Sequence, residues 1–120
     1  MLFAGISSSR SYEQIKLDFG YQKLSGNFVT VGGSFDYSKL GCSHHCYTDV
    51  SLISHLKRGV VVLPGSPIEF TKLFKDIYRN DSINYFRLPE VTHGVDFSDS
   101  EIQFGKGIKV RDGSDITIAV

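Results

Sequence analysis

The stretch that decides the fold runs Val60-Val61-Val62-Leu63-Pro64-Gly65-Ser66-Pro67-Ile68-Glu69. Its first part, residues 60–63, has no polar interruption, which is typical of a strand covered on both faces of a parallel sheet. The second part is a capping-box pattern, with Ser66 as N-cap, Pro67 at the first helical position and Glu69 reaching back from the third. A buried strand that passes directly into a helix predicts an α/β unit.

The same alternation extends in both directions from this stretch. The predicted helix runs to about residue 78, and residues 83–88 are predicted to form the next strand. Upstream, strands are predicted over residues 2–6 and 28–31, and helices over residues 8–24 and 48–57. The inward-facing residues are expected to be Tyr12, Ile15 and Phe19 in the first helix, Val50, Leu52, Ile53 and Leu56 in the second, and Phe70, Leu73, Phe74 and Ile77 in the third. Ser25-Gly26-Asn27 is expected to end the first helix in a left-handed conformation. Short connections between alternating elements imply right-handed crossovers, so we expect an α/β fold with a parallel sheet and flanking helices.

The texture of the sequence changes after Pro89. Residues 90–100 are polar without helical period and are predicted to be a linker. Residues 102–110 and 115–120 are predicted to be two strands of a C-terminal β-hairpin, joined at Arg111-Asp112-Gly113. A parallel sheet this small needs cover for its edges, which predicts a partner chain.

Composition limits the possible functions. The 120 residues fit one domain, and 13 basic residues balance 13 acidic ones. A neutral chain without clustered Lys and Arg argues against nucleic-acid binding. No apolar run reaches the roughly 18 residues of a membrane span, and the first residues lack the cationic flank of a signal peptide. We therefore expect a soluble, cytoplasmic protein that binds no membrane.

Several motifs occur together in a fixed order. Arg10-Ser11-Tyr12-Glu13-Gln14-Ile15 resembles the Arg-Ala-Tyr-Glu-Gln-Ile run in the pyrimidine-binding domain of transketolase-like proteins. Gly41-Cys42-Ser43-His44-His45, with Asp49 after it, is similar to that domain's Gly-Pro-Thr-His-(His/Gln) loop and its trailing acidic residue. Residues 62–69 and Phe86-Arg87-Leu88 resemble two of its strand ends, and residues 104–117 resemble the entry to the family's C-terminal domain. The ordered set, which covers nearly the whole chain, carries the resemblance.

This resemblance implies a domain division and a function. Residues 1–89 would be a partial, flavodoxin-like three-layer pyrimidine-binding domain, residues 90–100 a linker, and residues 101–120 the start of the C-terminal domain. The family uses thiamine diphosphate to transfer a two-carbon ketol unit between sugars, and the cofactor supplies the difficult chemistry. A partner subunit would carry the diphosphate-binding domain and its magnesium ion. The chain would then act on a sugar or sugar phosphate only within an oligomer, as a fragment or small subunit that is inactive alone.

The resemblance also assigns roles to individual residues. His44 matches the family histidine that faces the substrate and is the expected catalytic residue, although a loop histidine can also simply cap the following helix. His45 and Arg87 are expected to bind substrate, and Arg87 would equally suit a partner carboxylate or a surface ion pair. Ser7 and Arg10 occupy positions that face the cofactor's pyrimidine ring in the family.

Three departures from the family pattern favour a second reading, a non-catalytic interaction or scaffold remnant of the same fold. The glutamate that activates the aminopyrimidine lies upstream of the matching stretch. Ala4, Ser7 and Arg10 stand where the family has aromatic side chains, which would lower cofactor affinity. Glu90 replaces a second arginine that the family links to substrate phosphate.

The cluster of Cys42, His44, His45 and Cys46 also permits a zinc-binding reading. A structural zinc site needs a second ligand pair, and only His55 or His93, both expected at the surface, could complete it. We therefore predict no metal site and expect both cysteines to be small buried thiols.

Overall fold

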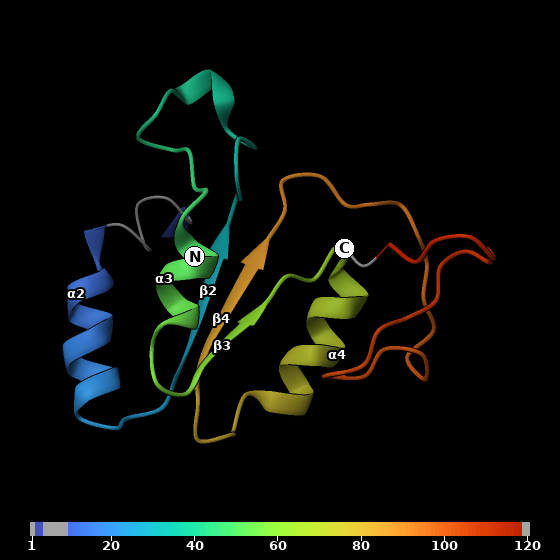
Figure 1. Cartoon of the computed structure of the whole chain (residues 1–120). Helices are drawn as coiled ribbons and strands as arrows, with labels where there is room; N and C mark the ends of the chain where they lie inside the picture. Colours follow the sequence, from blue (N-terminus) through green and yellow to red (C-terminus); the bar gives the residue numbers. More distant parts are fainter. Residues whose placement is uncertain (1, 4–9, 119–120) are drawn as a thin grey trace.

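The computed structural model describes residues 2–3 and 10–118. A short first strand is followed by three longer strands, and helical segments precede each of these longer strands (Figure 1). In chain order the elements are β1 (Leu2–Phe3), α2 (Tyr12–Gln14) continuing directly into η1 (Ile15–Tyr21), β2 (Gly26–Val31), η2 (Ser38–Leu40), α3 (Asp49–Ser54), β3 (Gly59–Val62), α4 (Pro67–Ile77) and β4 (Ile83–Leu88).

The strands form one parallel sheet in the order β1-β2-β4-β3. The central pair is in register from Gly26 opposite Ile83 to Val31 opposite Leu88. Because β4 is inserted between β2 and β3, the connection through α3 crosses it on one side of the sheet. The chain then turns back to β4 through α4. The predicted parallel α/β fold is confirmed.

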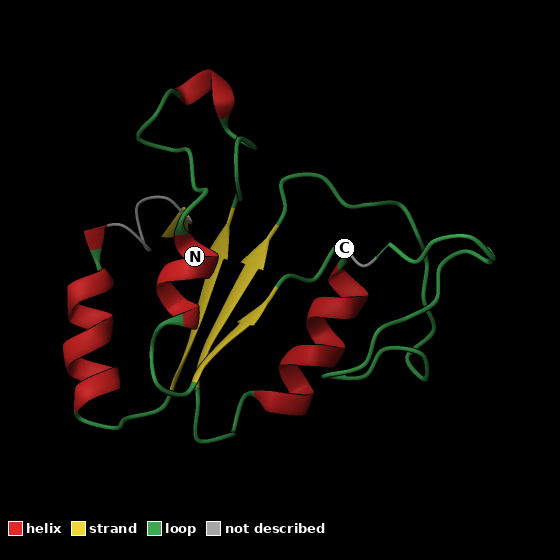
Figure 2. Cartoon of the chain, in the orientation of Figure 1, coloured by secondary structure: helices red, strands yellow, loops and turns green. Residues whose placement is uncertain are grey.

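Two apolar clusters hold helices against opposite faces of the sheet, giving the three layers that were predicted. On one face Ile15 of η1 and Ile53 of α3 pack with Ile83 and Tyr85 of β4. On the other face Ile77 of α4 packs with Phe86 and Val62. Figure 2 shows α4 on one side of the strands, with α3 and the helix formed by α2 and η1 on the opposite side. The alternation of β4 residues between the two clusters follows from the two-residue repeat of a strand.

The capping box at the start of α4 forms with one difference. Ser66 Oγ accepts a hydrogen bond from the backbone N–H of Glu69 at 3.3 Å, as predicted. Glu69 Oε2 reaches back to the backbone N–H of Gly65, at 2.7 Å, rather than to that of Ser66. The N-terminal end of α4 is therefore tied to the last residues of the β3–α4 turn.

The first helix is shorter than predicted at its C-terminal end. It ends at Tyr21 after seven residues of wide, π-type turns, and the left-handed residue beyond it is Lys23, with φ of 59°, rather than a residue of 25–27. Gly26 begins β2 instead. A Cβ on Gly26 would lie 2.7 Å from the Phe19 ring, so glycine is needed there for packing. Residues 8–9 of the predicted helix lie outside the described residues.

The predicted C-terminal hairpin is wrong for the described residues, because no strand follows β4 up to residue 118 (Figure 2). Ile102 is buried at 3% exposure, but Val110, Ile116 and Ile118 are largely exposed. A two-stranded hairpin without a sheet or helix to pack against is marginal at best, which explains why alternating apolar residues alone do not form it here. Among the described helices, none combines the length and apolar character that crossing a bilayer requires.

Candidate functional site

A hollow of about 220 Å³ lies at the carboxyl ends of the strands. The loop after β2 leads to α3 on one face, and the loop after β3 leads to α4 on the other. The hollow opens between these two loops, above the end of β4, and we call it the crevice. It is lined by Gly33, Ser34 and Asp36 from the first loop, Leu63, Pro64 and Gly65 from the second, and Arg87 and Pro89 at the end of β4. Open α/β sheets bind ligands at such a position, where neighbouring connections leave to opposite faces.

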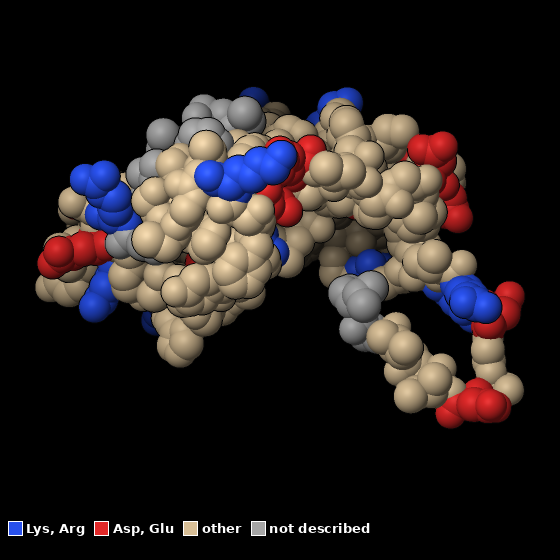
Figure 3. Space-filling model, turned by 90° about the horizontal axis from the view of Figure 1, so that it is seen from above, with Lys and Arg blue, Asp and Glu red and all other residues tan. Residues whose placement is uncertain are grey.

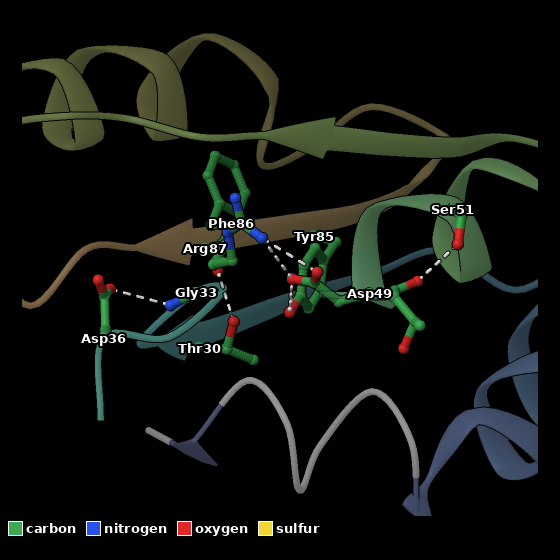
Figure 4. A network of polar contacts seen from close by, with 9 residues as sticks. Thr30, Gly33, Asp36, Asp49, Ser51, Tyr85, Phe86 and Arg87 are labelled. Carbon is green, nitrogen blue, oxygen red and sulfur yellow. Dashed lines mark hydrogen bonds and ion pairs between the residues drawn. The ribbon is translucent and has the colours of Figure 1, made fainter. Parts of the chain in front are cut away.

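Arg87 is held at the floor of the crevice by Asp49, the first residue of α3. Its Nη1 lies 3.0 Å from Asp49 Oδ1 and 3.2 Å from Oδ2 (Figure 4). The Asp49 side chain is completely buried, and that of Arg87 is 18% exposed. Among the readings left open for Arg87, the structure shows an ion pair, but one that is largely buried rather than at the surface.

Tyr85 completes the partners of this buried carboxylate. Its hydroxyl donates to Asp49 Oδ2 at 2.9 Å. Burial raises the pKa of the Tyr85 phenol well above its usual range, and the Asp49 charge adds to the rise. Tyr85 is therefore a hydrogen-bond donor throughout the neutral range. A buried charge is tolerated when it is both paired and hydrogen-bonded, and Asp49 meets both conditions.

The loop that carries the two candidate histidines is closed at its base. Ser34 and Cys46 form an antiparallel bridge. The Ser34 nitrogen lies 2.6 Å from the Cys46 carbonyl oxygen, and the Cys46 nitrogen lies 2.8 Å from the Ser34 carbonyl oxygen. Residues 35–45 project from the sheet between these positions (Figure 1). Within the loop, His44 is half-buried, and its Nδ1 lies 3.0 Å from Ser43 Oγ. The loop begins at the crevice, because Ser34 and Asp36 line it.

His45 lies at the base of the loop among aromatic rings. Its ring meets that of Phe35 edge-on, with centroids 4.9 Å apart, and Phe35 stacks on Tyr47. Its Nε2 is buried and has no hydrogen-bond partner among the described residues. A buried polar atom without a hydrogen bond is costly, so Nε2 needs a partner from outside the described residues, such as a water molecule or a ligand.

Of the two expected cofactor residues, only Arg10 is described, and it is not among the residues that line the crevice. Ser7 lies outside the described residues, and Arg10 is exposed just before α2. The structure thus pairs Arg87 with Asp49, three residues after the His44–His45 loop closes at Cys46, whereas Arg10 lies elsewhere.

Three acidic residues have structural partners that the sequence did not predict. Asp36 Oδ2 accepts the backbone N–H groups of Gly33 and Glu90, at 3.0 and 3.2 Å. Asp49 lies on the same helical stripe as Ile53 and Leu56, which was an available signal for its burial. Val50, predicted to point inward, is 36% exposed instead.

The third acidic residue is Glu69, whose Oε1 lies 2.6 Å from Nε2 of His93. His93 is at the surface, as predicted, and its side chain is bound there to Glu69. His55 is exposed, with its Nδ1 2.6 Å from Ser51 O.

The described residues contain no group of three or more His, Cys, Asp or Glu side chains placed to hold a metal ion. Of the two thiols expected to be buried, Cys46 is buried and Cys42 is exposed. Viewed from the carboxyl ends of the strands, basic and acidic side chains are interspersed rather than gathered by sign (Figure 3).

Comparison with known proteins places these observations in context. No family model matches the chain. It is 30% identical over 115 residues to one of the subunits of the apulose-4-phosphate transketolase of Phocaeicola vulgatus, a match that covers 92% of this chain and 36% of that protein. It is also 30% identical over 112 residues to 1-deoxy-D-xylulose-5-phosphate synthase of Syntrophotalea carbinolica, covering 91% of this chain and 18% of that one.

Among solved structures, the chain resembles a split-gene transketolase described as an inactive beta4 tetramer, with a TM-score of 0.68 and 21% identity. That match covers 82% of this chain and 31% of the other, and it supports the fold alone. The chain spans about a third of the length of the first curated relative it matches.

Proposed function

Since the chain belongs to the transketolase-like family, we propose that it forms part of a thiamine-diphosphate-dependent enzyme that transfers a two-carbon ketol unit between sugars. One observation carries the proposal. The loop with His44 and His45 is closed by the Ser34–Cys46 bridge and begins at a crevice with Arg87 at its floor. A rigid base of this kind holds side chains in the orientation that catalysis requires.

We assign roles to three residues within this proposal. His44 acts on the substrate as proton donor or acceptor, a role for which imidazole is suited near neutral pH. His45 and Arg87 bind the substrate, and the unpaired His45 Nε2 supports a contact to a group from outside the chain. The domain division belongs to the same proposal, with residues 1–89 as the partial pyrimidine-binding domain, 90–100 as a linker and 101–120 as the start of the next domain.

The described residues fit at most one wall of a thiamine diphosphate site. Asp49 is the only buried carboxylate among them, and Arg87 and Tyr85 already occupy it. No free buried acid is therefore available in the described part of the chain to activate the aminopyrimidine. The cofactor, when bound, supplies the chemistry at the sugar carbonyl. In this proposal the activating acid comes from outside the described residues, and a partner subunit provides the diphosphate-binding domain and the magnesium ion.

The proposal is tested by combining the purified chain with a transketolase-type partner subunit. Ketol transfer should appear only in the mixture with thiamine diphosphate and magnesium. His44→Asn should lower kcat by about 100-fold or more, as expected for loss of a general acid or base. His55→Asn, at an exposed histidine of α3's end, is the matched control and should retain full activity. Turnover by the chain alone, or none with any partner, contradicts the proposal.

The alternative, a non-catalytic interaction or scaffold piece of the same fold, is favoured by the lack of a free buried acid among the described residues. Calorimetric titration of the chain and its partner with thiamine diphosphate and magnesium separates the two. Binding that depends on this chain supports the enzyme. Equal binding of thiamine diphosphate by the partner alone and by the partner with this chain supports the scaffold alternative.

A further inference from the structure

The crevice presents a hydrogen-bond donor and an acceptor side by side. Arg87 uses only Nη1 for Asp49, so its Nε and Nη2 have no hydrogen-bond partner among the described residues. Asp36 uses only Oδ2, which accepts the N–H groups of Gly33 and Glu90, and its Oδ1 has no partner in the same part of the chain. Both side chains line the crevice. The geometry therefore offers a guanidinium edge and a carboxylate oxygen to one ligand.

Carboxylates outnumber cations among the described residues at the crevice. Arg87 is the only basic residue among the described ones that line it, and Asp49 is paired with Arg87. Asp36 contributes a second carboxylate, and the exposed Glu90 donates its backbone N–H to that carboxylate. Two carboxylates against one guanidinium disfavour a dianionic phosphate in the crevice, because charges within a few ångströms interact strongly beside a protein surface.

A hydroxyl group suits this site better than an anion, since it donates and accepts at the same time. Neighbouring hydroxyls of a sugar could accept from Arg87 and donate to Asp36. The volume of about 220 Å³ is below the range usual for whole drug-sized ligands, so the crevice has room for one end of a molecule. Leu63, Pro64 and Pro89 supply apolar walls against which carbon-bound hydrogens of a sugar can pack.

We propose that the crevice binds the uncharged, hydroxyl-bearing end of an unphosphorylated sugar and discriminates against its phosphate ester, with Asp36 as the residue that determines this specificity. The inference rests on the proposed function for placing this end next to the reacting carbon. Binding itself can be measured without catalysis.

The test is titration of the ¹⁵N-labelled full chain, followed by NMR, with D-fructose, D-fructose 6-phosphate and inorganic phosphate as separate probes. D-Fructose should shift the backbone signals of Gly33 and Ser34 and the Nε–H signal of Arg87. The two phosphates should bind there at least about tenfold more weakly. Tighter binding of either phosphate than of D-fructose, or no saturable shift with D-fructose, overturns the proposal.

Variants locate the specificity. Asp36→Asn should weaken D-fructose binding about tenfold, the usual effect of losing a hydrogen bond to a charged group, and should narrow the discrimination against phosphate. Asp18→Asn removes an exposed carboxylate of η1 and should change neither the affinity for D-fructose nor the discrimination against phosphate. Arg87→Lys keeps a cation beside Asp49 but removes the free guanidinium edge, so D-fructose shifts should disappear while the dispersion of the spectrum is retained. Unchanged affinities in Asp36→Asn overturn the assignment of Asp36.

The two proposals can fail separately. If D-fructose binds in the crevice but no partner mixture shows ketol transfer, the proposed function is wrong and the proposed sugar site stands. If ketol transfer uses D-fructose and its 6-phosphate equally and the NMR signals of the crevice residues do not shift, the proposed sugar site is wrong and the proposed function stands.

Discussion

Arg87 lies directly against the backbone of Gly33. A Cβ added at Gly33 would stand 2.6 Å from Arg87 Nε and 2.7 Å from its Cζ. The end of β2 and the end of β4 are thus in contact through a guanidinium group that Asp49 holds from the other side. The position of Arg87 depends on a residue without a side chain at 33.

Gly33→Ala should therefore displace Arg87 and weaken its pair with Asp49. We expect a loss of about 1–3 kcal/mol in the free energy of unfolding, the usual cost of overpacking. Gly107→Ala is the control, because a Cβ there meets nothing within 4 Å. Denaturant unfolding of both variants measures the difference, and equal stabilities would contradict the packing described here.

Asp49→Asn should destabilise the fold through the buried pair. The change preserves shape but leaves Arg87 without a counter-charge, for which we expect a cost of about 3 kcal/mol. Asp76→Asn breaks the Lys72–Asp76 pair on α4, whose side chains are 29% and 26% exposed, and should cost less than about 0.5 kcal/mol. Similar losses in the two variants, measured by urea unfolding, would show that burial of Asp49 contributes little.

Tyr85 should make stability fall at high pH. Its folded pKa is raised by burial above the value of about 10 for a free phenol, so the unfolded chain loses this proton first. The contribution is complete below about pH 10 and decreases as pH rises beyond it, by roughly 1.4 kcal/mol per pH unit. Tyr85→Phe should remove this component from the pH profile of unfolding, whereas Tyr21→Phe, at an 83% exposed tyrosine, should keep it. Identical alkaline profiles for wild type and Tyr85→Phe would refute the assignment.

His93 should hold the segment after β4 in place. Its Nδ1 accepts the backbone N–H of Val95 at 3.0 Å, and its Nε2 bonds to Glu69. We expect His93→Ala to raise the hydrogen-exchange rate of the Val95 amide about five- to tenfold, which corresponds to one lost hydrogen bond. His55→Ala should leave that rate unchanged. An unaltered rate in His93→Ala would mean that the segment is held by other contacts.

Local patterns were sufficient for the parts of the fold that depend on neighbouring residues. The capping residues at Ser66 and Glu69, and the aliphatic run of β3, predicted a strand and a helix that both form. The hairpin over residues 102–120 failed for the opposite reason. Alternating apolar residues form a strand only when another surface covers them, and Ile116 and Ile118 have none in the described chain.

The candidate site likewise divides into features that local sequence predicted and features that depend on distant residues. The resemblance brought out His44, His45 and Arg87, but the contacts that position them join distant parts of the chain. Arg87 and Asp49 are 38 residues apart, and Asp36 meets Glu90 across 54. No pattern within a single helix or strand contains such pairs, and Asp49 in particular is buried although it was not among the residues expected to face inward.

By itself, the sequence determined that strands and helices alternate, that the strands are parallel, and that the chain shares its motifs with transketolase-like proteins. Only the tertiary structure decided that Asp49 is a buried counter-charge, that Asp36 and Arg87 line one crevice, and that His45 Nε2 lacks a partner among the described residues. The physical reason is the separation along the chain over which each interaction acts. Hydrogen bonding and side-chain periodicity act over a few residues along the chain, whereas burial and charge pairing depend on which distant residues the fold brings together.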